Sequence, residues 1–108
     1  MKGTIHKDRN HPAKKYVLRL YVTGASRLSQ RAITNLNAIC REYLEGQYDL
    51  EVVDIYQSPV LTKAEDILAA PTLVKQLPLP VRRLIGDLSE RGRVLMMLDL
   101  TPKTVRHG

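Results

Sequence analysis

Residues Tyr16 to Val22 constrain the fold more than any other stretch, because they are almost continuously apolar and rich in β-branched and aromatic side chains. Such a run predicts a strand buried on both faces, at the centre of a sheet covered by helices. After the turn-like residues 23–26, apolar side chains recur at helical spacing from Ile33 to Leu44, and Gly46 is placed to end this helix. Residues 50–55 then predict a second strand. This order predicts a parallel pair joined by a right-handed crossover.

The middle of the chain predicts one more helix and one more strand. Ser58-Pro59 is typical of a turn, and residues 61–68 carry apolar side chains on one side of a short helix. Residues 70–74 form a third apolar stretch. The resulting βαβαβ order indicates an α/β layer architecture.

The length and the composition of the chain indicate how many domains it forms and which kinds of partner it can bind. With 108 residues and 44% hydrophobic content the chain favours one domain, expected at 15–101 between a basic tail (1–14) and a short C-terminal tail (102–108). The net charge of +6 could attract nucleic acid, but the chain has no Phe or Trp to stack on bases. No apolar run reaches the roughly 20 residues of a membrane span, and the N-terminus lacks the apolar core of a secretory signal. We therefore expect a cytoplasmic protein whose partners are proteins.

The last third of the domain fits two periodicities. Val81, Leu84, Ile85 and Leu88 form a helical stripe, in which case residues 94–98 form a strand. Alternatively, residues 81–85 form a strand, Gly86-Asp87 turns, and Ser89 caps a helix that runs to about residue 98. Both interpretations stay open, and a segment compatible with both can hold two packings separated by a few kcal/mol.

The sequence predicts no catalytic residue, metal site or cofactor. A thioredoxin-type enzyme needs a cysteine pair where the first strand meets the first helix, and residues 25–28 contain no thiol. Cys40, the only cysteine, lies within the predicted helix and is expected to be buried. The histidines lack the spacing of metal ligands and lie near the ends of the chain, at His6, His11 and His107.

Four blocks of sequence form a recognisable set: residues 16–24 (YVLRLYVTG), 53–55 (VDI), 70–73 (APTL) and 80–89 (PVRRLIGDLS). Together they resemble the KaiB family of circadian clock proteins, without gaps from about Lys15 to Leu100. The resemblance implies an α/β protein with a thioredoxin-like βαβ N-terminal half. Its C-terminal half is expected to adopt either the KaiB ground-state fold (βαββααβ) or the thioredoxin-like fold (βαβαββα).

The resemblance also implies a mode of action. A resting homo-oligomer, a tetramer or dimer, would convert to a thioredoxin-like monomer that binds the ATPase ring of a KaiC-like hexamer. The bound form would capture KaiA and displace the SasA sensor kinase, so that the phosphorylation cycle of the ATPase is regulated by binding and competition. The alternative is a KaiB homologue that serves as an adaptor in stress adaptation, outside a complete clock.

Family contact positions fall on five residues of suitable type here: Tyr16, Arg31, Tyr48, Lys75 and Arg82. Two positions depart, because Glu51 and Asp66 stand where clock members tend to carry lysine. Each change reverses a charge, so the partner surface is expected to differ.

The change of fold is expected to involve Pro71, Pro78, Pro80, Met97 and Asp99. Ala70-Pro71 resembles the cis-proline site of thioredoxin-like folds, and the other two prolines flank the switching half. Met97 replaces a familiar glycine and favours regular structure, whereas Asp99 is retained.

Overall fold

The computed structural model describes residues 15–101; the two predicted tails lie outside this part. The elements follow one another as β1 (Tyr16–Val22), α2 (Arg27–Tyr43), β2 (Tyr48–Asp54), α3 (Pro59–Ala64), β3 (Thr72–Leu77), β4 (Arg82–Ile85) and α4 (Arg91–Met97). This order is βαβαββα, the thioredoxin-like alternative, so the structure has a strand rather than a helix at 82–85.

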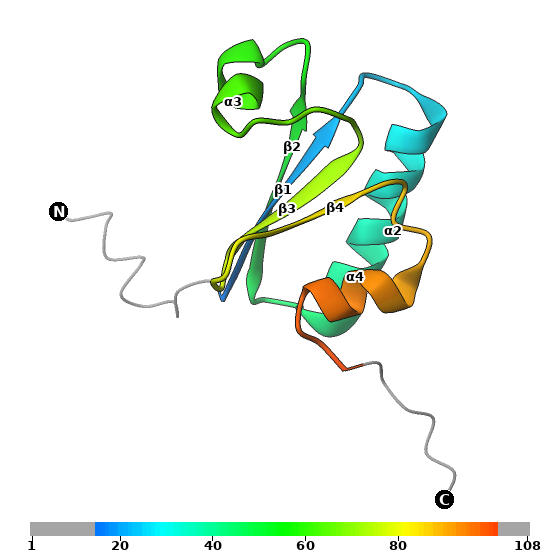
Figure 1. Cartoon of the computed structure of the whole chain (residues 1–108). Coiled ribbons are helices and arrows are strands. Elements are labelled where there is room, and N and C mark those ends of the chain that lie inside the picture. The colour runs from blue at the N-terminus through cyan, green and yellow to red at the C-terminus, as the bar shows by residue number, and fades with distance from the viewer. Residues whose placement is uncertain (1–14, 102–108) are drawn as a thin grey trace, which may run out of the picture.

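A single mixed sheet organises the domain (Figure 1). Its strand order is β2-β1-β3-β4, with β2 parallel to β1 and both β3 and β4 antiparallel to their neighbours. The predicted parallel pair and the central position of residues 16–22 are confirmed. Because β1 and β3 occupy the interior of the sheet, β2 and β4 form its two edges.

The alternation of side chains along β1 serves two separate cores. Leu18 and Leu20 face the side on which α2 and α4 pack, where Leu36 and Leu95 belong to the same cluster. Tyr21 faces the other side, in a smaller cluster under α3. Successive side chains of a strand point to opposite faces, so a strand apolar at both sets of positions is buried on both.

The N-terminal caps of α2 and α4 can be compared with the caps that the sequence indicates. The Ser26 side chain accepts a hydrogen bond from the Ser29 N–H and caps α2 at its N-terminus. The prediction that Ser89 caps the last helix is wrong by one residue, since the cap position is Glu90. The Ser89 N–H donates to the Asp87 carboxylate at 3.0 Å. Aspartate side chains commonly accept a hydrogen bond from the backbone N–H two residues later in the chain.

A hydrogen bond joins the first strand to the end of the last helix. The Tyr16 hydroxyl donates to the Leu98 carbonyl at 2.9 Å, across 82 residues of sequence. This carbonyl lies at the C-terminal end of α4, where helical carbonyls lack an intrahelical partner. The bond therefore fastens α4 to the sheet.

We expect Tyr16→Phe to lower the free energy of unfolding by about 1–2 kcal/mol, because the buried Leu98 carbonyl loses its donor. Urea denaturation followed by circular dichroism measures this change. Tyr56→Phe, which removes a hydroxyl from an exposed side chain, is the matched control with no expected loss. Equal stability of the Tyr16 variant and the wild type would contradict a supporting role for this bond.

Candidate partner-binding site

The five predicted contact residues do not form one surface. Tyr16 and Lys75 are buried, with exposed fractions of 6% and 0%. Arg31 and Arg82 are exposed, the first on α2 and the second on the edge strand β4. Tyr48 is half-buried at the start of the opposite edge strand, β2. The fold therefore divides these residues into an internal pair and separate surface positions.

The two predicted tyrosines are neighbours in the sheet. Tyr16 of β1 stands opposite Tyr48 of β2 in the parallel register, and Tyr48 packs against the main core. Burial, followed by the negative charge of Asp99, raises the pKa of Tyr16, so its hydroxyl stays protonated as a donor. Tyr16 offers almost no surface to a partner, whereas part of Tyr48 stays accessible at the edge.

Lys75 is a buried charge held by three oxygen atoms. Its Nζ donates to the carbonyls of Pro78 and Pro80 at 2.6 and 2.9 Å. The Asp99 carboxylate lies 3.8 Å from the same nitrogen. A buried ammonium needs such oxygen partners, because removing it from water is costly. A partner that binds this fold without opening it cannot reach the Lys75 side chain.

The lysine thus links most of the residues expected to take part in a change of fold. Pro78 and Pro80 belong to the β3–β4 turn, and Asp99 follows α4 with a positive φ of 59°. Met97 lies in the main core. We call these contacts of Lys75 with Pro78, Pro80 and Asp99 the Lys75 clamp, which joins the two ends of the C-terminal half.

The remaining residue expected to take part, Pro71, lies at the start of β3. The Ala70–Pro71 bond is cis, as its resemblance to the cis-proline site predicted. The Pro71 carbonyl accepts a hydrogen bond from the Gly86 N–H at 3.0 Å, next to the β3–β4 ladder. Gly86 has a φ of +127°, which glycine adopts more readily than other residues.

Arg31 is placed beside the loop between β4 and α4. Its guanidinium lies 3.7 Å from the Asp87 carboxylate. Hydrogen bonds from Ser89, with a smaller contribution from Arg31, hold the pKa of Asp87 below its usual range. Asn35 also donates to the Asp87 carbonyl at 2.9 Å. The loop is therefore fastened to α2, which sets the position of Arg31 relative to the C-terminal half.

The two acidic departures from the family pattern lie on the side of the sheet that carries α3. Glu51 is exposed and pairs with Arg19 of β1 at 3.1 Å. Arg19 also pairs with Glu65 at 3.3 Å. The exposed Asp66 offers its carbonyl to the Arg83 guanidinium at 3.0 Å. Glu51 is thus paired within the fold, whereas the Asp66 carboxylate adds a negative charge to this surface.

Sequence reasoning missed the polar network around Glu65. Its carboxylate accepts hydrogen bonds from Arg19, Tyr21 and Gln76, three residues on two adjacent strands. The available signal was Arg19, the single charge in an apolar strand. Such a charge needs a partner nearby in space, but the position of Glu65 depends on the packing of α3.

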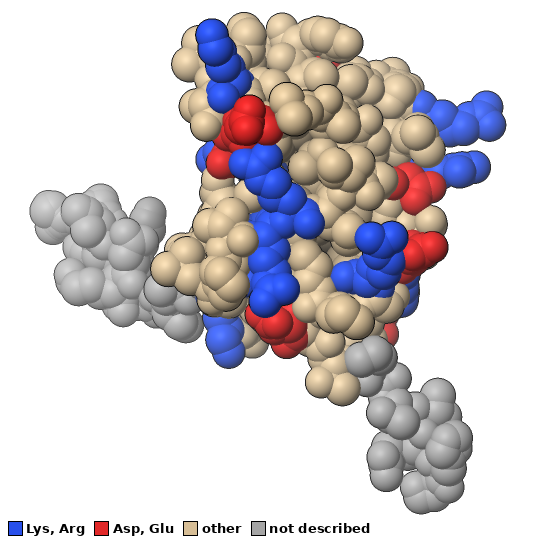
Figure 2. All heavy atoms as spheres, in the orientation of Figure 1, with Lys and Arg blue, Asp and Glu red and all other residues tan. Residues whose placement is uncertain are grey.

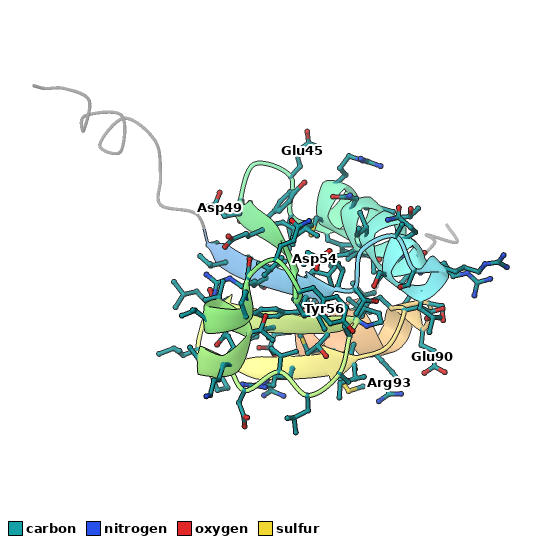
Figure 3. All side chains as sticks on the ribbon, turned by 90° about the horizontal axis from the view of Figure 1, so that it is seen from above. Glu45, Asp49, Asp54, Tyr56, Glu90 and Arg93 are labelled. Atoms are coloured by element: carbon teal, nitrogen blue, oxygen red, sulfur yellow. The ribbon has the colours of Figure 1, made fainter. Side chains whose placement is uncertain are left out.

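The position that carries the reactive thiols in thioredoxin-type enzymes is a hydroxyl-lined turn here. Thr23 Oγ1 donates to Ser26 Oγ at 3.1 Å, and the neighbouring Gly24 N–H donates to the Asp54 carboxylate at 2.9 Å. Asp54 also accepts from the Tyr56 N–H at 2.8 Å, and Figure 3 shows both residues at the end of β2. This turn contains no thiol.

Within residues 15–101, no three His, Cys, Asp or Glu side chains are grouped so that they could hold a metal ion. The helices in the same range are too short or too polar to cross a membrane.

Cys40 is expected to react slowly, because burial raises the pKa of its thiol to about 11. Relative to a free thiol this lowers the thiolate fraction at pH 8 about 100-fold, and the thiolate is the reactive form. Ellman's reagent should therefore label the folded protein at least about 100-fold more slowly than the protein in guanidinium chloride. Equal rates in both conditions would place Cys40 at an accessible site.

Lys75→Met is expected to lower the free energy of unfolding by about 2–4 kcal/mol, because two carbonyls lose their donor. Asp99→Asn is the matched control. It keeps both carbonyl contacts and changes a half-exposed carboxylate, so its loss should stay below about 1 kcal/mol. Chemical denaturation measures both values. A smaller loss for Lys75→Met than for Asp99→Asn would show that the clamp is not stabilising.

Comparison with solved structures shows the fold. The structure matches the germline thioredoxin Deadhead of Drosophila melanogaster with a TM-score of 0.68 at 16% identity, over 90% of this chain and 91% of that one. It matches the N-terminal domain of Synechococcus elongatus SasA with a TM-score of 0.66 at 20% identity, over 97% of both chains. The domain therefore has a thioredoxin-like fold.

Comparison with known sequences shows the family. Residues 19–100 match the KaiB domain. The chain is 53% identical to the circadian clock oscillator protein KaiB of Prochlorococcus marinus strain MIT 9211, over 82% of this chain and 78% of that protein. It is 47% identical to the circadian clock protein KaiB3 of a Synechocystis strain, over 82% and 87% of the two chains. The chain therefore belongs to the KaiB family of circadian clock proteins.

Proposed function

We propose that this protein binds the ATPase ring of a KaiC-like hexamer in its thioredoxin-like state. It regulates the phosphorylation cycle of that ATPase by capturing and displacing other partners, and it acts by binding alone. The observation that carries the proposal is the combination of membership of the KaiB family with a βαβαββα fold. In this family the βαβαββα state is the one expected to dock on the ring.

The similarity to SasA supports competition as the mode of action. The SasA N-terminal domain has the same fold over almost the whole of both chains. Two domains of one fold can present equivalent side chains to one surface, so the binding of one excludes the other. We propose that a SasA-type kinase is displaced in this way, and that the bound state also captures a KaiA-like protein.

Arg31, Tyr48 and Arg82 serve as the direct contacts in this proposal, because each keeps surface that a partner can reach. Arginine suits such a role, since its guanidinium forms bidentate bonds with carboxylates and stays charged at all relevant pH values. Lys75 and Tyr16 act from inside. They hold the β3–β4 turn and α4, and so determine where Arg82 is presented.

The resting state is a homo-oligomer with the alternative fold of the C-terminal half. Conversion between the states requires that the Lys75 clamp opens, because Lys75, Pro78, Pro80 and Asp99 lie on segments that change their structure. The clamp supports the proposal by providing a defined set of interactions that exists in only one state. A ring that binds this state raises its population by mass action.

The acidic surface near α3 favours a second candidate, an adaptor that acts in stress adaptation outside a complete clock. Asp66 replaces a familiar lysine and is exposed, and Glu51 cancels the charge of Arg19 instead of adding to it. Charge reversal at an interface suppresses binding to the original partner. An adaptor with a different partner would account for both replacements.

The decisive experiment mixes the purified protein with a KaiC-like hexamer, with and without ATP, for a day, and separates complexes by size. We expect an ATP-dependent complex. Arg82→Glu should weaken it at least about tenfold, since an exposed cation at an interface becomes an anion. Absence of a complex after this time would favour the adaptor.

Arg41→Glu is the matched control for Arg82→Glu, because it makes the same charge change at another exposed position. Arg41 lies ten residues after Arg31 in α2, about 15 Å along the helix. Its complex should keep wild-type affinity within about twofold. If both variants weaken the complex equally, net charge rather than the Arg82 contact carries the interaction.

A further inference from the structure

Strand β4 exposes a predictable set of backbone groups at the edge of the sheet. The Gly86 N–H donates to the Pro71 carbonyl at 3.0 Å, which makes these two a hydrogen-bonded pair next to the ladder. Pairs in an antiparallel ladder alternate between bonded and non-bonded. In the β3–β4 register, Arg83 and Ile85 belong to the non-bonded pairs. Their N–H and C=O groups therefore point outward, away from β3.

The side chains of β4 divide between the two faces of the sheet. The Arg83 guanidinium reaches the backbone carbonyls of Glu65 and Asp66 on the α3 side. Arg82 and Leu84 consequently face α4. A groove of about 340 Å³ lies there and is lined by Arg82, Arg83, Leu84, Arg93, Met96 and Met97.

The groove is positively charged and partly apolar. No carboxylate lines it, and within residues 15–101 the Arg82 guanidinium forms no ion pair or hydrogen bond. Arg93 has a 3.5 Å contact with Glu90, but exposed pairs of this kind contribute little. Met96, with 73% of its surface exposed, supplies a flexible apolar wall.

The figures show where the charges lie around this edge. Lys and Arg side chains run along the face that carries β4 in Figure 2. Figure 3 shows Arg93 beside Glu90, across the molecule from Glu45 and Asp49, which lie on the β2 side. The positive groove and the outward backbone groups thus share one edge of the sheet.

A second copy of this chain is a poor occupant for this edge. Two β4 strands paired about a twofold axis would bring Arg82 and Arg83 of both copies close together, and like charges across a strand pair destabilise it. Nucleic acid is also disfavoured, because no tyrosine lines the groove and the chain has no Phe or Trp to stack on bases. Charge complementarity favours an acidic protein segment.

We propose that the β4 edge is a docking site for an extended acidic segment of a partner protein, which adds to the sheet beside β4. Its backbone pairs with Arg83 and Ile85, and its carboxylates contact Arg82 and Arg93 on the α4 face. The apolar side chains that alternate with the carboxylates lie on the other face, beside the exposed Ile85. Strand addition of this type obtains affinity from the main chain and specificity from alternate side chains. The proposal rests on the proposed function only for the identity of the partner.

The test uses the ¹⁵N-labelled full-length protein and a capped ten-residue peptide of alternating Glu and Val. We expect the amide signals of Arg83 and Ile85 to shift most, and that of Leu84, which is already bonded within the sheet, to shift less. Arg82→Glu and Arg93→Glu should each raise the dissociation constant about tenfold, whereas Arg41→Glu should change it less than twofold. A peptide of alternating Lys and Val should cause no shifts at β4.

Two variants test the strand pairing itself. Ile85→Pro removes only an outward N–H, since Ile85 donates nothing to β3, and proline is tolerated at such edge positions. It should abolish peptide binding while the spectrum remains that of a folded protein. The second variant is the same Glu-Val peptide with alternate backbone nitrogens methylated, which leaves the protein unchanged. It should fail to bind, and unchanged affinity of this peptide would overturn the proposal.

Other outcomes separate the groove from the proposed function. Stronger shifts of the same amides with a duplex DNA of 12 base pairs than with the peptide would replace the proposal with a nucleic-acid surface. If the peptide binds at β4 but no KaiC-like complex forms, the docking site at β4 is supported and only the proposed KaiC-like partner is contradicted. If a KaiC-like complex forms but the peptide does not shift the β4 amide signals, the proposed docking site at β4 is wrong and the proposed function is unaffected.

Discussion

The burial of β1 on both faces is the constraint on which the rest of the structure depends. Leu18 and Leu20 must meet apolar side chains on one side, and Tyr21 on the other. The sheet therefore needs a layer on each face, which α2 and α4 supply together on one side and α3 on the other. Because β1 also needs a partner strand along each edge, β2 and β3 flank it. The two free edges of the sheet are therefore formed by β2 and by the short strand β4.

A buried charge controls the C-terminal half of this arrangement. The Lys75 ammonium is fully buried and is stabilised by oxygens that the β3–β4 turn and the end of α4 provide. Loss of both carbonyl contacts would leave a buried charge without hydrogen-bond partners, which is strongly destabilising. A chain that leaves this fold must therefore move the lysine to a new set of partners or to solvent. This makes Lys75 a natural point of control for a change of fold.

Much of the fold could be predicted from the sequence, because it depends on patterns within short segments of the chain. The strand at 16–22 follows from a continuous apolar run, the helix that contains Cys40 from hydrophobic periodicity, and the parallel crossover from the order of these elements. The C-terminal third left two interpretations, because Val81, Leu84, Ile85 and Leu88 fit a helix as well as a strand. The structure has the strand, since the 82–85 segment pairs with β3 and Leu84 packs against the main core. Neither contact is visible in a short stretch of sequence.

By itself the sequence determined the family, the order of the elements as far as β3 and the absence of a thiol pair where a thioredoxin enzyme needs one. These depend on residue type and spacing, which are properties of the chain. Only the tertiary structure decided that Lys75 and Tyr16 are internal, that Arg31 and Arg82 lie apart, and that Arg83 and Ile85 direct their backbone groups outward. Burial and register arise from contacts between residues distant in sequence. The residue type of a lysine does not reveal its role, because its surroundings in the fold decide whether it contacts a partner or stabilises the fold.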